Sequence, residues 1–231
     1  SFFNDTASTE IYTLSLHSAL PISTTPYVVM EFVPGTTLRT FCRADHLLPL
    51  ELVIEVGFKL AMALGYVYRQ GLIHRDVKPA NIMAITNAAG VVTDVKITDF
   101  GSALNLAAES TQIHQVGSLA YMSPEQLDGQ VLDSRADIYA LGAVLYHLIA
   151  GRPPFDAPSQ AVMMNQIYNQ APAPLAGLRS GVNEAVDEVV LKALAKDPKD
   201  RYPNWDAFCA GFVRPDRRPQ GAARADPGRA R

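Results

Sequence analysis

Three short motifs of polar and charged residues, placed in a fixed order, constrain this chain more than any other feature of its sequence. The first is the eight-residue run His74–Asn81, which reads HRDVKPAN. The second is the tripeptide DFG, which begins at Asp99, and the third is the tripeptide SPE, which ends at Glu125. Two short apolar runs on either side of Asn87–Gly90 predict a β-hairpin between the first two motifs. Each motif is weak alone, but the three in this order are specific.

The hydrophobic pattern predicts a mostly helical body with a few strands near its start. Apolar residues recur with a helical period over Leu50–Gln70, and Gly71 follows as a helix stop. A β-rich run, Tyr27–Phe32, predicts a short strand that Pro34 and Gly35 end. The other predicted elements are a short helix over 37–43, a hairpin of 82–85 with 95–97, a long polar loop over 99–125, and helices over 135–150, 160–169, 183–195 and 204–212.

The three motifs resemble the catalytic loop, the metal-binding DFG motif and the APE-type motif of eukaryotic-like serine/threonine protein kinases, in a style that looks bacterial. The resemblance covers the chain from about Tyr27 to Phe212. It implies a protein-kinase-like α+β fold, consisting mainly of the helical C-terminal lobe with the hinge and the last strand of the N-terminal lobe. The spacing from Asn81 to Asp99 is longer than the family usually shows, and a longer hairpin accounts for it.

The resemblance assigns roles in phosphoryl transfer to five polar residues. Asp76 would orient the acceptor hydroxyl and take its proton, while Lys78 would place a positive charge on the transferring phosphate. Ser118 stands where such kinases usually carry threonine, and its hydroxyl would bridge Asp76 and Lys78. Asn81 and Asp99 would supply a neutral and an anionic oxygen to Mg²⁺, a hard ion that prefers oxygen ligands. In the family that the chain resembles, a lysine two residues after the catalytic aspartate goes with serine or threonine as the acceptor, so Lys78 implies these rather than tyrosine.

The resemblance also implies an ATP site at the hinge between the two kinase lobes. The backbone of Glu31 and Val33 would bond the adenine, with Met30 behind the pocket. Met83, two residues after Asn81, would form the floor of the pocket. An ordinary buried strand is the alternative for this stretch, because hinge residues are generic in type.

Several residues near the motifs are predicted to be architectural rather than catalytic. His74 is expected to be a core histidine near Phe100. Asp137 lies in an apolar helix, where an unpaired charge is costly, and the resemblance has it holding the backbone of the catalytic loop. The resemblance also implies that Arg201 pairs with Glu125, which fits the preference of a buried carboxylate for a bidentate partner.

The two ends of the chain are set apart from a kinase-like segment, 23–212. Residues 1–22 show no helix or strand period and resemble translated sequencing-adapter DNA. They are predicted to be non-native, with a divergent native N-terminus as the alternative. Residues 213–231 hold six arginines, two aspartates and three prolines, and are predicted to be a disordered basic tail. The alternative for this tail is a contact with a membrane or nucleic acid.

The amino-acid composition narrows the classes of partner and compartment expected for the chain. The net charge of −3 gives no reason to expect nucleic acid, and a protein substrate and ATP are the partners that the resemblance implies. Two cysteines, Cys42 and Cys209, form no metal-binding spacing and suggest free thiols in a reducing compartment. No apolar run reaches the roughly 20 residues of a membrane span, so a cytoplasmic chain is expected, while a parent protein with a membrane anchor stays open.

The upstream phosphate-binding elements of a kinase are not found in this sequence. No GxG occurs in the chain, and its first lysine is Lys59, inside the helix that follows the hinge. The chain is therefore predicted to be a fragment without most of the N-terminal lobe, inactive or weakly active alone. The alternative functions are a non-catalytic kinase-like scaffold and a phosphotransferase for small molecules. Intact Asp76, Lys78, Asn81 and Asp99 favour a catalytic parent protein, and the SPE motif favours protein substrates.

Overall fold

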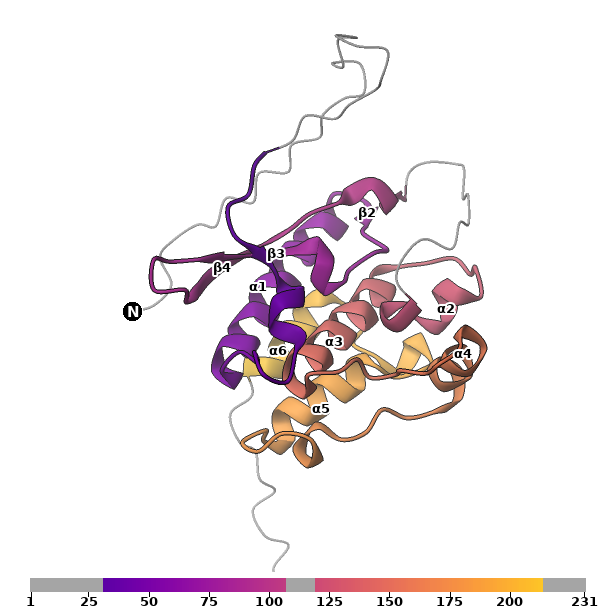
Figure 1. The fold of residues 1–231 in the computed structure, drawn as a ribbon. Coiled ribbons are helices and arrows are strands. Elements are labelled where there is room, and N and C mark those ends of the chain that lie inside the picture. The colour runs from indigo at the N-terminus through magenta and orange to yellow at the C-terminus, as the bar shows by residue number, and fades with distance from the viewer. Residues whose placement is uncertain (1–30, 107–118, 214–231) are drawn as a thin grey trace, which may run out of the picture.

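The computed structural model describes residues 31–106 and 119–213, which form a helical body with a small antiparallel sheet at one side (Figure 1). The helices are α1 (Leu50–Arg69), α2 (Pro124–Leu127), α3 (Ser134–Ala150), α4 (Gln160–Asn169), α5 (Glu184–Ala193) and α6 (Trp205–Val213). The strands are β1 (Thr36–Thr37), β2 (Leu72–Ile73), β3 (Ile82–Thr86), β4 (Val92–Ile97) and β5 (Leu104–Asn105). Short 3-10 helices are η2 (Leu38–Cys42), η3 (Pro79–Asn81), η4 (Phe100–Ser102), η5 (Leu119–Tyr121), η6 (Leu175–Gly177) and η7 (Pro198–Asp200). The α+β fold and the predicted helices are confirmed.

The predicted hairpin is the centre of the small sheet. Strands β3 and β4 are antiparallel, with Ile82 opposite Ile97, and β1 pairs with the other edge of β3. The turn follows from local chemistry, because the Asn87 side-chain oxygen accepts hydrogen bonds from the backbone N–H of Ala89 and Val91. The hairpin therefore starts directly after Asn81 and ends directly before the DFG segment.

Gly35 fixes how the chain enters this sheet. Its φ is +139°, and a Cβ atom there would lie 2.2 Å from the carbonyl oxygen of Ala84 in β3. Only glycine allows this backbone conformation and this close approach together. Pro34 and Gly35, which the sequence predicts to end a strand, thus bring β1 into position to pair with β3.

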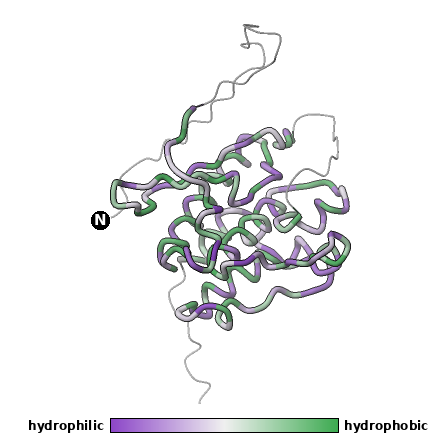
Figure 2. The backbone as a smooth tube through the Cα atoms, viewed as in Figure 1, coloured by the Kyte–Doolittle hydropathy of each residue, from purple (hydrophilic) through white to green (hydrophobic). Residues whose placement is uncertain are grey.

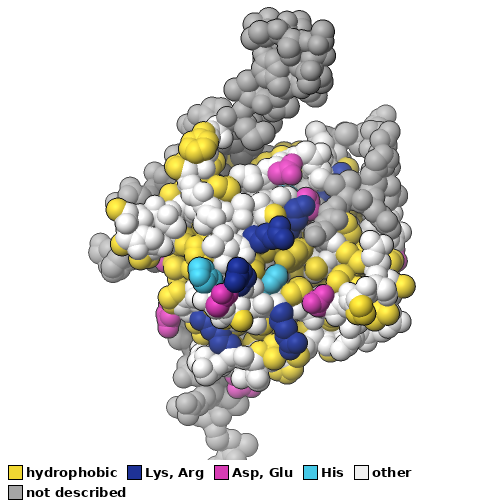
Figure 3. All heavy atoms as spheres, in the orientation of Figure 1, with side chains coloured by type: hydrophobic (Ala, Val, Ile, Leu, Met, Phe, Trp, Pro, Cys, Tyr) yellow, Lys and Arg dark blue, Asp and Glu magenta, His cyan; other side chains and the backbone are white. Residues whose placement is uncertain are grey.

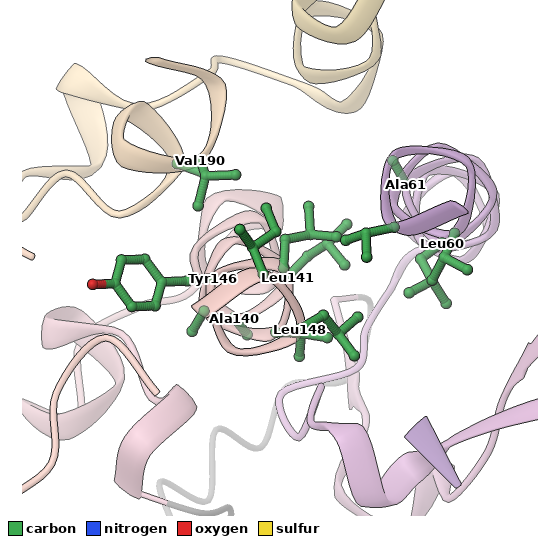
Figure 4. Close-up of a cluster of buried hydrophobic side chains, with 14 of the residues drawn as sticks. Leu60, Ala61, Ala140, Leu141, Tyr146, Leu148 and Val190 are labelled. Atoms are coloured by element: carbon green, nitrogen blue, oxygen red, sulfur yellow. The ribbon is translucent and has the colours of Figure 1, made fainter. Parts of the chain in front are cut away.

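The hydrophobic core lies where α1, α3, α5 and α6 meet. Figure 4 shows Leu60 and Ala61 of α1, Leu141 and Leu148 of α3, and Val190 of α5 directed toward a common interior. Helix α3 is buried along most of its length, as expected of a helix that is apolar on all sides (Figure 2). On the face of the molecule drawn in Figure 3, acidic side chains are interspersed with Lys and Arg and with apolar side chains.

Two expectations need correction in the described residues. The strand predicted over Tyr27–Phe32 does not include Glu31 and Phe32, because neither pairs with a neighbouring strand; residues 27–30 lie outside the described residues. The loop predicted over 99–125 contains short ordered pieces, which are η4, β5, η5 and the start of α2. Strand β5 pairs with β2, a two-residue contact too short to give a hydrophobic pattern.

Within 31–106 and 119–213, no helix is both long and apolar enough to cross a bilayer. Cys42 and Cys209 are both free and buried. Burial raises the pKa of the Cys42 thiol to about 12.

Candidate active site

The segment that carries HRDVKPAN begins where α1 ends. Gly71, with φ of +78°, ends the helix, and β2 leads to His74, which is fully buried. Arg75 follows with φ of +64°, a conformation that non-glycine residues rarely adopt and that the surroundings must hold in place.

Asp137 of α3 holds this bend. Its two carboxylate oxygens accept hydrogen bonds from the backbone N–H of His74 and Arg75, at 2.8 and 2.9 Å. Only 4% of Asp137 is exposed, and burial raises the pKa of its carboxyl, whereas the two N–H donors favour the ionised form. The role predicted for Asp137, to hold the backbone of the loop, agrees with this geometry.

The interior of the loop brings together three of the predicted catalytic side chains. Lys78 Nζ lies 2.7 Å from Asp76 Oδ2, and Asn81 Nδ2 donates to the same oxygen at 2.9 Å. Asn81 Nδ2 also donates to the backbone carbonyl of Asp76 at 2.9 Å. Asp76 is thus only 7% exposed, and two hydrogen-bond donors orient its carboxylate. One of these donors, the Lys78 ammonium, carries the opposite charge.

His74 contributes packing and orientation. Its Nδ1 accepts the backbone N–H of Asp76 at 3.3 Å, which leaves Nε2 as the donor to the Thr98 carbonyl at 3.1 Å. The ring meets the Phe100 ring edge-on, with centroids 4.7 Å apart. A ring with both nitrogens engaged and no exposed surface is a structural histidine, as the sequence predicted.

The β3–β4 hairpin brings the DFG segment beside Asn81. The backbone N–H and the hydroxyl of Thr98 both reach the Asn81 carbonyl, at 2.8 and 3.1 Å. Asp99 follows directly, with φ of +62°, and its side chain is exposed except for a 3.3 Å contact from Gly101 N. Residues eighteen apart in sequence therefore lie together because a hairpin closes between them.

Asn81 and Asp99, the two predicted metal ligands, each present an oxygen atom that can coordinate a cation. Both protons of Asn81 Nδ2 are donated to Asp76, so its carbonyl oxygen Oδ1 is the atom left for a cation. The Asp99 carboxylate is exposed. No group of three or more His, Cys, Asp or Glu residues gathers in the described part of the chain. An amide oxygen and one carboxylate suit Mg²⁺, which usually keeps waters and binds substrate phosphates as well.

The predicted adenine site is described only in part. Glu31 is exposed and its carboxylate contacts Lys96 Nζ at 2.6 Å, while Val33 and Met83 are half-buried. Met83 lies opposite Lys96 in the β3–β4 register and opposite Thr37 of β1. Glu31 and Met83 are thus both adjacent to Lys96. Met30 and Ser118 lie outside the described residues.

The SPE motif is held in place by Arg201, which lies 76 residues after Glu125 in the chain. Arg201 donates to both carboxylate oxygens of Glu125, at 2.6 and 2.8 Å. Its remaining N–H groups reach the carbonyl oxygens of Ala195, Arg135 and Lys196. All five N–H donors of the Arg201 guanidinium are therefore hydrogen-bonded, so the predicted ion pair with Glu125 leaves none of them without an acceptor in the interior.

Three contacts around the site were not expected from the sequence. Gln126 Nε2 donates to the Arg75 carbonyl at 2.6 Å, and Arg75 Nε donates to the Ser102 carbonyl at 2.5 Å. The hydroxyl of Tyr121 lies 2.8 Å from His147 Nδ1. The first two contacts join the catalytic loop to the SPE and DFG segments, and the third joins η5 to α3; no spacing in the sequence predicts them.

Comparison with known proteins shows what this arrangement resembles. Residues 8–212 match the protein kinase domain family. The chain is 41% identical over 194 residues to the serine/threonine-protein kinase PknB of Mycobacterium leprae, covering 82% of this chain and 30% of that protein. It is 40% identical over 193 residues to PknB of Mycolicibacterium smegmatis, covering 82% and 30%. The identity to PknB of Mycobacterium tuberculosis is 40% over 199 residues, covering 84% and 31%. The chain thus spans about a third of these relatives' length.

Proposed function

The chain belongs to the protein kinase family, and on that premise we propose that it carries the phosphoryl-transfer site of a serine/threonine protein kinase. The observation that carries the proposal is the Asp76 carboxylate, which is oriented by Lys78 and Asn81 beside the DFG segment. Phosphoryl transfer needs positioning and charge neutralisation more than covalent chemistry, and this arrangement offers both.

Asp76 is proposed to bind the acceptor hydroxyl. Its Oδ2 is held by Lys78 and Asn81, so the second oxygen is left to accept the hydroxyl proton. As the acceptor oxygen forms its bond to the γ-phosphorus of ATP, the bond from that phosphorus to the bridging oxygen breaks. The hydroxyl proton passes to Asp76. Lys78, whose ammonium lies 2.7 Å from Asp76, offsets the negative charge of the transferring group.

Asn81 Oδ1 and the Asp99 carboxylate are proposed to hold Mg²⁺, which neutralises phosphate charge when it is bound. The αL backbone at Asp99 and the Gly101 N–H contact orient that carboxylate. The backbone of Glu31 and Val33, with Met83 below, is proposed to bind adenine. Met30 and Ser118 keep the roles that the family resemblance gives them, as proposals.

Protein substrates are proposed rather than small molecules, because η5 and the SPE motif that follows it are held by tertiary contacts. The hydroxyl of Tyr121 forms a hydrogen bond with His147 Nδ1, and the carboxylate of Glu125 accepts hydrogen bonds from Arg201. A cytoplasmic setting is proposed for this segment, since ATP and two free thiols both fit a reducing compartment.

The direct test uses a full-length protein that contains this sequence. It is incubated with radiolabelled ATP, Mg²⁺ and a generic protein substrate, and the labelled amino acids are identified after hydrolysis. Label on serine or threonine that requires Mg²⁺ supports the proposal. Label confined to a small molecule, or nucleotide binding without transfer, would favour the small-molecule phosphotransferase or the non-catalytic scaffold.

A further inference from the structure

Gln126 lies in α2, directly after Glu125, and its side chain reaches the catalytic loop. Gln126 is only 8% exposed, and its Nε2 atom donates to the backbone carbonyl of Arg75 at 2.6 Å. A backbone carbonyl can only accept a hydrogen bond, so the amide nitrogen must be the atom that faces Arg75. Because a buried polar group is costly without a partner, the fold favours keeping this contact.

The contact holds a strained part of the backbone. Arg75 has φ of +64°, and the backbone N–H groups of His74 and Arg75 donate to Asp137. These two bonds fix the peptide planes on the N-terminal side of Arg75. The next plane, between Arg75 and Asp76, is held at its carbonyl by Gln126 and at its N–H by His74 Nδ1, at 3.3 Å. The 2.6 Å bond from Gln126 is the shorter of these two.

The plane between Arg75 and Asp76 determines where the Asp76 carboxylate lies. If this plane rotates, φ of Asp76 changes and the side chain moves relative to Lys78 and Asn81, which hold its Oδ2 at 2.7 and 2.9 Å. A displacement of about 1 Å in a reacting group can cost roughly a hundredfold in rate. The position of this one peptide plane therefore bears directly on phosphoryl transfer.

Helix α2 is a well-supported base for the Gln126 side chain. On one side of Gln126, the Glu125 carboxylate accepts two hydrogen bonds from Arg201, at 2.6 and 2.8 Å. On the other side, Leu127 belongs to a small cluster of buried apolar residues, with Met122, Phe155 and Ile167. Because both neighbours are fixed by tertiary contacts, the Gln126 amide can keep a strained backbone from relaxing.

We propose that Gln126 is a positioning residue for phosphoryl transfer, which fixes the peptide between Arg75 and Asp76 and so sets the direction of the Asp76 carboxylate. This role rests on the function proposed above, because it needs Asp76 to act on the acceptor hydroxyl. It links α2 to the reacting carboxylate through a single peptide unit. Arg75 extends the link to the DFG segment, since its Nε donates to the Ser102 carbonyl at 2.5 Å.

The test compares Gln126→Met with Gln130→Met in a full-length protein that contains this sequence. Methionine has nearly the length of glutamine but no N–H donor. Gln130 is the matched control, because it is exposed and its Nε2 donates to Asp128 rather than to the catalytic loop. Steady-state rates with Mg²⁺ and ATP are measured at a temperature at which thermal melts show every variant to be folded.

Gln126→Met is expected to lower kcat roughly ten- to a hundredfold, with the KM for ATP and for the protein substrate unchanged. Gln130→Met should keep wild-type values of both constants. A merely structural role would leave kcat unchanged in fully folded samples, so equal kcat for the two variants would overturn the proposal. A higher KM at unchanged kcat would also overturn it, because Gln126 would then act in substrate binding.

A second variant covers the case in which Gln126→Met does not fold. Gln126→Asn keeps the amide but is one methylene shorter, so its nitrogen is withdrawn from the Arg75 carbonyl. Its kcat should fall in the same way, and a wild-type kcat would contradict the role of the 2.6 Å contact.

Amide hydrogen exchange over residues 74–78 tests the contact without a transfer assay. Exchange should be faster in Gln126→Met than in wild type and in Gln130→Met, because the plane that carries the Asp76 N–H loses a support. Unchanged exchange would overturn the link between Gln126 and the loop. A wild-type protein that transfers no phosphate would overturn the proposed function, whereas normal transfer by Gln126→Met would overturn this inference alone, so the two failures are distinguishable.

Discussion

Glu125 and Arg201 are 76 residues apart in the chain, yet both carboxylate oxygens of one accept hydrogen bonds from the guanidinium of the other. Both side chains are almost completely buried. Breaking a buried ion pair leaves one charge without compensation, which is more costly than the pair is stabilising. This relationship makes the C-terminal part of the chain a support of the SPE motif.

Arg201→Ala is therefore expected to lower the free energy of unfolding by about 3–5 kcal/mol, because Glu125 would remain buried and unpaired. Denaturant melts of Arg201→Ala, Glu125→Ala and the double variant measure this. The double variant should lose much less than the sum of the two. Strictly additive losses would show that the side chains do not interact. Arg43→Ala, which breaks an exposed pair with Asp45, serves as the control and should leave the midpoint unchanged.

Asp76→Asn is expected to abolish phosphoryl transfer in a full-length protein while preserving its fold. The amide keeps the shape of the side chain but cannot take the proton of the acceptor hydroxyl. Steady-state assays with Mg²⁺ and ATP, together with a thermal melt, separate the two effects. The matched control is Asp94→Asn, which changes an exposed carboxylate in β4 and should retain turnover. Near-normal turnover of Asp76→Asn would contradict the role given to Asp76.

Gly35→Ala is expected to destabilise the sheet strongly. The added Cβ would lie 2.2 Å from the Ala84 carbonyl oxygen, so the backbone of β1 or β3 must move. Gly90→Ala is the control, because Gly90 also has positive φ (+76°), but a Cβ atom added there would meet nothing within 4 Å. The control should cost only about 1–2 kcal/mol of backbone strain. Similar losses for the two variants would mean that the contact with Ala84 does not matter.

The stability of the chain should rise with pH just above pH 8. The pKa of Lys196 is about 8 in the folded chain and near its ordinary value of 10.5 when unfolded. Between these values the unfolded state binds more protons, so the free energy of unfolding increases with pH. Melts between about pH 7 and 9, below the range in which tyrosines ionise, should show this slope in wild type and in Lys199→Met. The rise should be absent from Lys196→Met, in which the raised thiol pKa values of Cys42 and Cys209 leave only a fall toward pH 9. A rise that persists in Lys196→Met would exclude Lys196 as its source.

The 231-residue chain alone is expected to transfer phosphate far more slowly than intact kinases, which turn over at about 1–100 per second. No lysine precedes Lys59 and no GxG occurs in the sequence, so phosphates at Asn81 and Asp99 would stay in water. Charge contacts are weak there, and positioning is lost. A radiolabelled-ATP assay on the purified chain measures the rate. Turnover in the range of intact kinases would reveal a phosphate-binding lysine that this prediction overlooks.

The sequence by itself determined the main helices and the β3–β4 hairpin, and it indicated the kind of chemistry. The helical period over Leu50–Gln70 places α1, and the Asn87–Gly90 turn places the hairpin, because both depend on local backbone and side-chain preferences. The resemblance of their motifs to those of kinases assigns Asp76, Lys78, Asn81 and Asp99 to phosphoryl transfer, and their donor and acceptor types suit phosphate and Mg²⁺. The pairing of Arg201 with Glu125 could be expected only through the family resemblance.

Tertiary structure decided which of these groups meet and how they are held. The bend at Arg75 depends on Asp137, 62 residues later, and on the Gln126 amide, and neither contact leaves a local pattern. Lys196 looks like any other lysine in the sequence, yet its burial and the charge of Arg201 lower its pKa to about 8. Such properties depend on burial and on neighbours distant in the chain, so they arise only when the helices pack around the core.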